Sequence, residues 1–146
     1  MQNRHTIPFQ HWSLRVGRAD PQTREVRPFF GEIVTAVDDL DQSIGNLILT
    51  PLGTVPTEPE KGCDVTPFID RHPEEAIPNL TRVIWDALTM WEPRIVVQDV
   101  TVEQVAYSHF STKVFWRPIE SVLDDLRVTE VTFGANDNEA DQRRVA

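Results

Sequence analysis

The sequence predicts an α+β fold in which two amphipathic helices pack on a small antiparallel or mixed β-sheet, with an extended N-terminal arm or hairpin. Two segments repeat apolar residues with the 3.6-residue period of a helix. A region rich in β-branched residues follows them, and no segment of the chain is repeated. The 146 residues suit a single domain. We divide it into an N-terminal arm or hairpin over 1–30, a core over 31–133 and a flexible acidic tail over 134–146.

The N-terminal arm contains a strand pattern. Trp12, Leu14 and Val16 alternate with polar residues, which is typical of a half-buried strand. A proline-containing turn is predicted at 19–22. Residues 25–27 are then expected to return antiparallel to the first strand.

The first helix is predicted over Asp39–Leu49, after a short strand at 32–37. Asp39 is placed at the N-cap, and Gln42 follows three residues later, as in a capping box. The apolar positions 40, 44, 47 and 48 form one stripe for packing. Pro51 ends the helix, because proline disfavours a helical conformation of the residue before it.

A proline-rich loop and a second helix follow. Residues 51–78 contain six of the eleven prolines, which predicts an ordered surface loop, since each ring fixes φ. The second helix has its apolar stripe from Ile77 to Trp91. Pro78 either begins it or lies within a first turn that starts near Glu74.

The remainder of the core has the pattern of a sheet. Strands are predicted at 95–105, 112–117 and 127–133. The inward face of the first strand changes near 98–99, which predicts a bulge. Residues 119–125 are either a short helix or a loop.

Composition and charge exclude several classes of function. The chain has 14 Lys and Arg against 23 Asp and Glu, a formal net charge of -9. This balance argues against nucleic-acid binding through phosphates. Residues 1–30 have a net charge of +3, from five arginines, one Asp and one Glu, which leaves -12 for 31–146. The basic arm is either an ordinary surface segment or a contact for an acidic neighbour.

Cysteine, histidine and glycine patterns predict no metal and no cofactor. The single cysteine, Cys63, excludes an internal disulfide and indicates a reducing compartment. The four histidines lack the spacing of zinc ligands, and there is no glycine-rich phosphate loop. The longest apolar runs are too short to span a bilayer.

The corner between the second helix and the next strand has the richest chemistry. Trp91, Glu92, Pro93 and Arg94 place an aromatic ring, an acid, a rigid residue and a guanidinium in succession. The planar guanidinium suits bidentate pairing with a carboxylate or docking on carbonyl groups. Two interpretations stay open: a helix stop with an ordinary surface ion pair, or a docking point for another protein.

Several of these segments together resemble a known family. The chain is similar to the sheath-initiating wedge proteins of contractile-tail phage baseplates, a family that has also been labelled lysozyme and is related to a type VI secretion baseplate component. The resemblance covers roughly residues 32–133. It rests on Asp-Asp-Leu-Asp-Gln-Ser-Ile (38–44), Leu-Thr-Pro-Leu-Gly-Thr-Val-Pro (49–56), Ile-Trp-Asp-Ala-Leu (84–88) and Trp-Glu-Pro-Arg-Ile (91–95). The loop at 58–64 departs from the family pattern and is longer.

The resemblance implies a structural subunit of the virion and no enzyme. Such a protein joins wedge subunits and templates the first sheath ring by β-strand augmentation, in which an edge strand accepts a strand from a partner. The implied partners are other baseplate wedge proteins, the tail sheath protein and tail tube or hub proteins, without nucleic acid or membrane. The implied location is the tail baseplate, after synthesis in the host cytoplasm.

Two interfaces are expected on this basis. Strands within 95–133 are expected to form the sheet that docks sheath arms, and Glu92 and Arg94 are expected to contact the helical core of neighbouring wedge subunits. The partner-binding residues predicted are Trp91, Glu92, Pro93, Arg94, Val114, Trp116, Val128 and Val131.

Two other functions stay open. A lysozyme-like glycan hydrolase of the tail requires two carboxylates that face one cleft at a separation of about 5–9.5 Å. The acidic pairs at 38–39, 74–75 and 124–125 are explained as well by the preference of helix starts for negative charge. A small regulatory adaptor of the same fold would need a partner surface without a sheath.

Overall fold

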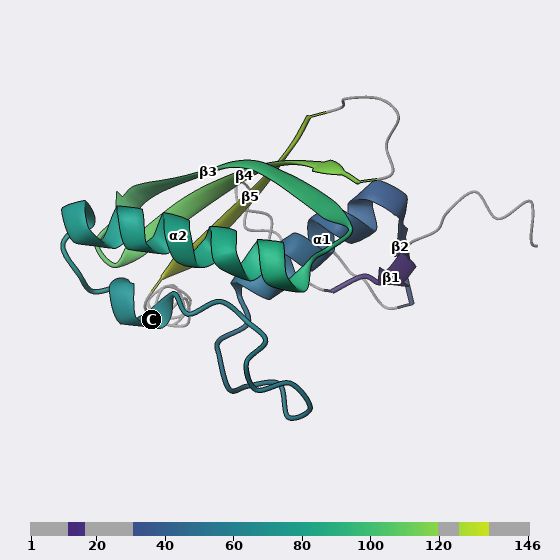
Figure 1. Ribbon diagram of the computed structural model, residues 1–146, viewed down its shortest axis with the longest axis horizontal. Coiled ribbons are helices and arrows are strands. Elements are labelled where there is room, and N and C mark those ends of the chain that lie inside the picture. Colours follow the sequence, from purple (N-terminus) through teal and green to yellow (C-terminus); the bar gives the residue numbers. More distant parts are fainter. Residues whose placement is uncertain (1–11, 17–30, 120–125, 135–146) are drawn as a thin grey trace, which may run out of the picture.

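The chain folds as predicted, into an α+β structure (Figure 1). A computed structural model describes residues 12–16, 31–119 and 126–134. Their elements are, in order, β1 (Trp12–Leu14), β2 (Ile33–Thr35), α1 (Ala36–Ile48), the short 3-10 helix η2 (Thr66–Phe68), α2 (Pro73–Trp91), β3 (Ile95–Ala106), β4 (His109–Pro118) and β5 (Arg127–Gly134).

The main sheet is antiparallel and has the strand order β3-β4-β5. A register shift between Val97 and Asp99 confirms the bulge predicted near 98–99, and a second shift lies between Gln104 and Ala106. Both extra residues belong to β3. The pairing of β4 with β5 has no shift over its length, so β5 is the regular outer strand of this sheet.

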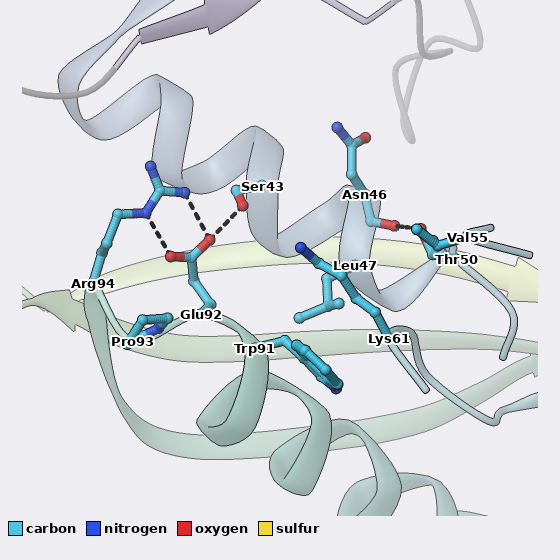
Figure 2. A pocket seen from close by; sticks show the side chains of 10 residues that line it. All are labelled: Ser43, Asn46, Leu47, Thr50, Val55, Lys61, Trp91, Glu92, Pro93 and Arg94. Atoms are coloured by element: carbon cyan, nitrogen blue, oxygen red, sulfur yellow. Dashed lines mark hydrogen bonds and ion pairs between the residues drawn. The ribbon is translucent and has the colours of Figure 1, made fainter. Parts of the chain in front are cut away.

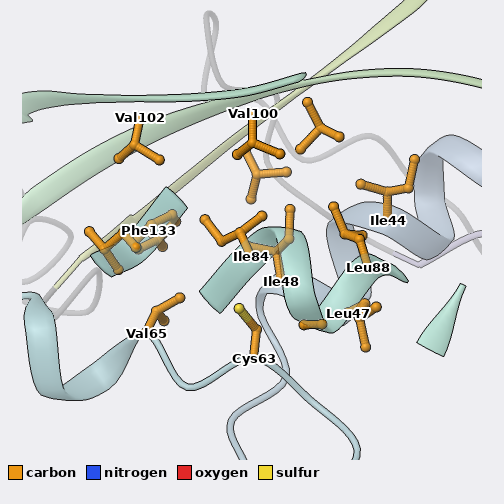
Figure 3. Packing of buried hydrophobic residues seen from close by; sticks show 14 of the residues in the cluster. Ile44, Leu47, Ile48, Cys63, Val65, Ile84, Leu88, Val100, Val102 and Phe133 are labelled. Carbon is orange, nitrogen blue, oxygen red and sulfur yellow. The ribbon is translucent and has the colours of Figure 1, made fainter. Parts of the chain in front are cut away.

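Both helices pack against one face of the sheet and form the core with it (Figure 3). The apolar stripe predicted for α2 is buried, as Leu80, Ile84 and Leu88 show. Residues of β5 alternate between buried and exposed, because side chains along a strand point to opposite faces. The opposite face of the sheet is therefore not covered by either helix.

The helix starts differ from the prediction. α1 begins at Ala36 after the extended residue Thr35, and Asp39 lies buried inside the helix instead of capping it. α2 begins at Pro73 and includes Pro78, in agreement with the longer of the two alternatives. Pro73 suits the first position of the helix, where its missing N–H has no partner to lose.

The N-terminal strand differs more strongly. β1 pairs antiparallel with β2, and the side chains predicted to be half-buried are exposed: Trp12 by 66% and Leu14 by 64%. Period-two alternation identifies a strand, but contacts with the rest of the fold decide which face is buried. In this two-stranded sheet the buried face is that of Val34 in β2, which pairs with Ser13 of β1. The predicted turn at 19–22, the return strand at 25–27 and the tail after Gly134 lie outside the described residues, as does 120–125.

The loop after α1 is held by backbone hydrogen bonds, in agreement with the prediction of an ordered loop. The Cys63 N–H donates to the Thr50 carbonyl at 2.8 Å. Gly62, which precedes Cys63, has a φ of 141°, and a Cβ at this position would lie 2.5 Å from the Thr50 carbonyl oxygen. Only glycine therefore fits this close approach of the two backbone segments. Burial, with a smaller contribution from Asp64, raises the pKa of the Cys63 thiol to about 12, so this buried thiol stays protonated at neutral pH.

Candidate functional site

The corner between α2 and β3 contains a network of polar and charged side chains, which we call the corner cluster: Asp39, Ser43, Glu92 and Arg94. Figure 2 shows Ser43, Glu92 and Arg94. The Arg94 guanidinium donates to both oxygens of Glu92, from Nε at 2.6 Å and from Nη2 at 2.7 Å. Ser43 Oγ also donates to Glu92. Arg94 Nη1 donates to Asp39 at 3.2 Å. The cluster therefore fastens the corner to α1.

Within the corner cluster, Glu92 and Arg94 form an ion pair whose carboxylate is buried. Glu92 is only 4% exposed, and the Arg94 side chain is 34% exposed. Burial alone would raise the pKa of Glu92, but hydrogen bonds from Arg94 and Ser43 and the charge of Arg94 outweigh burial and lower it. The hydrogen bond to Glu92 and the two neighbouring carboxylates raise the pKa of Arg94, against the effect of burial. The helix does stop at this corner, as one of the two interpretations holds, but the Glu92 side of its ion pair is buried and does not lie on the surface.

A groove of about 320 Å³ lies beside the corner cluster (Figure 2). Lys61 reaches over the Trp91 ring, with Nζ 5.8 Å from the ring centre, a favourable cation–π arrangement. The described residues that line the groove are Ser43, Asn46, Leu47, Thr50, Val55, Lys61, Trp91, Glu92, Pro93 and Arg94.

The chemistry of the groove does not suit hydrolysis. Among its described lining residues, Glu92 is the single carboxylate. Its pKa is lowered, whereas a general acid in a glycosidase needs a raised pKa. The groove is instead a concave surface with an aromatic and cationic edge.

α1 connects this corner to the N-terminal sheet. The Gln42 side chain accepts a hydrogen bond from the Val16 N–H at 2.9 Å. Its amide nitrogen donates to the Leu14 carbonyl at 2.8 Å and to Ser13 at 3.0 Å. Gln42 therefore holds β1 against the helix, and it does not act as part of a capping box.

α1 also connects the corner to β5. The Thr129 hydroxyl donates to Asp41 at 2.5 Å and accepts a hydrogen bond from the indole N–H of Trp116 at 2.7 Å. A single helical stretch, 39–43, thus supports the corner, β1 and β5.

The predicted partner-binding residues fall into two separate groups. Trp91, Glu92, Pro93 and Arg94 meet at the groove. The other four lie on the sheet: the side chains of Val114, Trp116 and Val131 are buried in the core, and that of Val128 is 51% exposed on the opposite face. The side chains at the three buried positions are therefore not accessible to a partner, and Val114 and Trp116 lie on the central strand, which is paired on both sides.

The direction of the backbone groups in β4 follows from one hydrogen bond. Ile119 directly follows β4, and its N–H donates to the Arg94 carbonyl at 3.0 Å. The backbone N–H of Ile119 therefore points toward β3. Backbone groups of successive residues in a strand point to opposite sides. Because both register shifts insert residues into β3 and none into β4, the N–H group of every second residue counted back from Ile119 points toward β3. The N–H groups of Val114 and of the residues two positions from it point toward β5.

The free side of β5 can now be assigned. Val114 is paired with Thr129, so Thr129 directs its N–H toward β4. The N–H groups of Val128, Glu130 and Thr132 consequently point away from β4. Within the part of the chain that the structure describes, no strand is paired with that side.

Sequence reasoning missed four residues of α1. Asp39 and Gln42 were assigned to capping, and Asp41 and Ser43 were given no role. The available signal was the segment 38–44, which carries the family resemblance. In the described ranges, no group of three or more His, Cys, Asp or Glu residues could hold a metal ion, and no helix could cross a membrane.

Comparison with known proteins bears on the fold and the family. A candidate tail lysozyme from Geobacter sulfurreducens has a similar structure, with a TM-score of 0.60 and 18% identity over 69% of this chain and 92% of that chain. A chain of the type VI secretion system baseplate complex has a TM-score of 0.55 and 20% identity over 64% of this chain and 88% of its own. No curated protein sequence matches.

The family assignment comes from the sequence. Residues 34–114 match the family "Baseplate wedge protein gp25". The match begins in β2 and ends in β4, and it includes the groove and the whole corner cluster. Since it spans more than half of the 146 residues, the chain belongs to the baseplate wedge protein gp25 family, whose members are structural components of baseplates.

Proposed function

We propose that this baseplate protein joins wedge subunits through the groove beside the corner cluster and templates the first sheath ring by accepting a strand at β5. The observation that carries the proposal is the regular outer edge of β5, with three backbone N–H groups directed away from the sheet. Such an edge binds an extended segment through main-chain hydrogen bonds.

β5 is the better of the two edges of the sheet. β3 contains two register shifts, and bulges are one of the devices by which proteins protect edges from strand addition. It also exposes Asp99 and Glu103. β5 has no shift against β4.

Glu130→Pro tests the sheath side of the proposal. Proline removes the outward N–H at this position without removing a bond to β4, a setting in which edge strands tolerate it. We expect tails whose tube and baseplate assemble but whose sheath does not. Glu130→Ala, which keeps the N–H, should assemble normal sheath. Full-length sheath around the tube in the proline variant, with baseplate incorporation unchanged, would refute strand acceptance at β5.

The wedge side needs a variant that leaves the corner cluster intact. Arg94→Ala is unsuitable, because it strands Glu92 in the interior without its partner and destabilises the fold itself. Asn46→Arg instead fills the groove from α1. We expect it to abolish co-purification with wedge partners while circular dichroism stays unchanged. Glu103→Arg, on the exposed side of β3, is the matched control, and equal co-purification of both variants would contradict the proposal.

The alternative function, a glycan hydrolase, has no observation in its favour in the groove. Glu92, the single carboxylate among the described residues that line the groove, is occupied by Arg94 and Ser43. Contacts with tail tube or hub proteins stay a prediction.

A further inference from the structure

We infer that the segment accepted by β5 carries two consecutive basic residues between apolar ones, in the pattern apolar–basic–basic–apolar. This inference rests on the proposed function of β5 and specifies the chemistry of its partner. It follows from two acidic side chains beside β5, one on each face of the sheet.

The first acidic group is Glu130, on the face of the sheet that the helices leave uncovered. Its register partner in β4 is Lys113, and its carboxylate accepts a hydrogen bond from Ser111 at 3.0 Å. Glu130 thus has a basic neighbour on one side and the open edge on the other. Opposite charges directly across two strands are favourable, and like charges are unfavourable. A basic residue of the added strand fits beside Glu130.

The second acidic group is Asp41, on the helix-covered face. It accepts a hydrogen bond from Thr129, yet the residue itself is exposed. An added strand places the residue opposite Thr129 on this same face, because side-chain direction alternates in step along paired strands. A basic residue there would lie near the Asp41 carboxylate.

The flanking positions are apolar. Val128 precedes these two positions and is half exposed, so an apolar partner would cover it. Val131 follows them on the core face, where an apolar partner would extend the core. Since 128–131 are consecutive, the pattern reads the same in both chain directions, and parallel and antiparallel addition require the same four residues.

The test uses the full chain with a strand segment appended after Ala146 through a flexible Gly/Ser linker, which raises the effective concentration of the segment. One version carries Val-Lys-Lys-Val between Thr residues, and the matched version carries Val-Glu-Glu-Val. The readout is amide hydrogen exchange at Glu130 and Thr132 by NMR. We expect exchange at least roughly tenfold slower with the lysine version, as a favourable cross-strand pair with Glu130 and a favourable contact with Asp41 on α1 replace two unfavourable contacts.

A charge reversal on the receiving strand separates the two claims. In Glu130→Lys the preference for the lysine version should shrink or invert. In the chain with Glu130 unchanged, equal protection by both versions would overturn the charge pattern and leave strand acceptance standing. Absence of protection by either version would overturn strand acceptance, and the charge pattern with it.

Discussion

Glu92 is the side chain on which the corner between α2 and β3 depends. It follows the last residue of α2, and its N–H completes the helix by donating to the Leu88 carbonyl at 3.0 Å. Its carboxylate is nearly inaccessible to solvent and is satisfied by Arg94 and Ser43. Buried ion pairs are costly to break on one side only, because the remaining charge stays without a partner.

Glu92→Gln should therefore lower the free energy of unfolding by about 2–3 kcal/mol, a value below that of a fully buried pair because Arg94 is partly exposed. Urea unfolding followed by circular dichroism measures it. Glu75→Gln is the matched control: Glu75 pairs with Arg71 at 2.6 Å, but both side chains are more than half exposed. Its loss should stay within about 0.5 kcal/mol. Similar losses for the two variants would contradict the account of the corner cluster.

The lowered pKa of Glu92 also predicts how stability depends on pH. Its ordinary pKa in the unfolded chain is about 4.3, so the stabilisation is fully present above that pH and is lost as pH falls through the lower pKa of the folded state. The unfolding free energy of the unaltered chain should thus fall more steeply below about pH 5 than that of Glu92→Gln. Parallel curves from pH 6 to pH 3 would show that Glu92 is not stabilised by its partners.

At the scale of elements, α1 is the shared support of the molecule. Residues 39, 41, 42 and 43 lie within little more than one turn, and their side chains reach α2–β3, β5 and β1. A helix with one apolar stripe thus uses its polar flanks for tertiary contacts.

Gln42→Ala should detach β1 while leaving the main sheet intact. Three hydrogen bonds are lost, and β1 has exposed apolar side chains that do little to hold it. Hydrogen exchange with mass spectrometry should show amides of residues 12–16 exchanging at least roughly tenfold faster, with β4 unchanged, since local elements open separately from the core. Asn46→Ala, one turn further along α1, is the control. Unchanged exchange at 12–16 would mean that Gln42 does not anchor β1.

The elements were predictable where one physical signal decided them. The apolar period of α2 and the β-branched strands needed no tertiary information, and the bulge in β3 was visible as a change of inward face. The roles of Asp39 and Gln42 were not predictable, because the same side chains suit a cap and a tertiary contact equally well. Which face of β1 is buried could not be read from alternation, since the answer depends on α1.

At the scale of the whole molecule, two candidate surfaces are joined through one helix. The groove borders one flank of α1. β5 is attached to α1 by the hydrogen bond from Thr129 to Asp41. The corner residues that the sequence grouped together do meet at the groove, and their role in partner binding stays a prediction. The side chains of Val114, Trp116 and Val131, predicted for the same role, lie in the core. Hydrophobic strand residues look the same at both places, and only the strand order shows that β4 is central.

The most direct test of strand acceptance is a cryo-EM map of an assembled tail that contains this protein. We predict a strand of another chain along 127–134, on the side to which Val128, Glu130 and Thr132 direct their N–H groups, at the spacing of about 4.7–4.9 Å that hydrogen-bonded strands have. A sheath segment paired with β3 instead, or an edge of β5 that stays unpaired beneath a complete first sheath ring, would contradict the account.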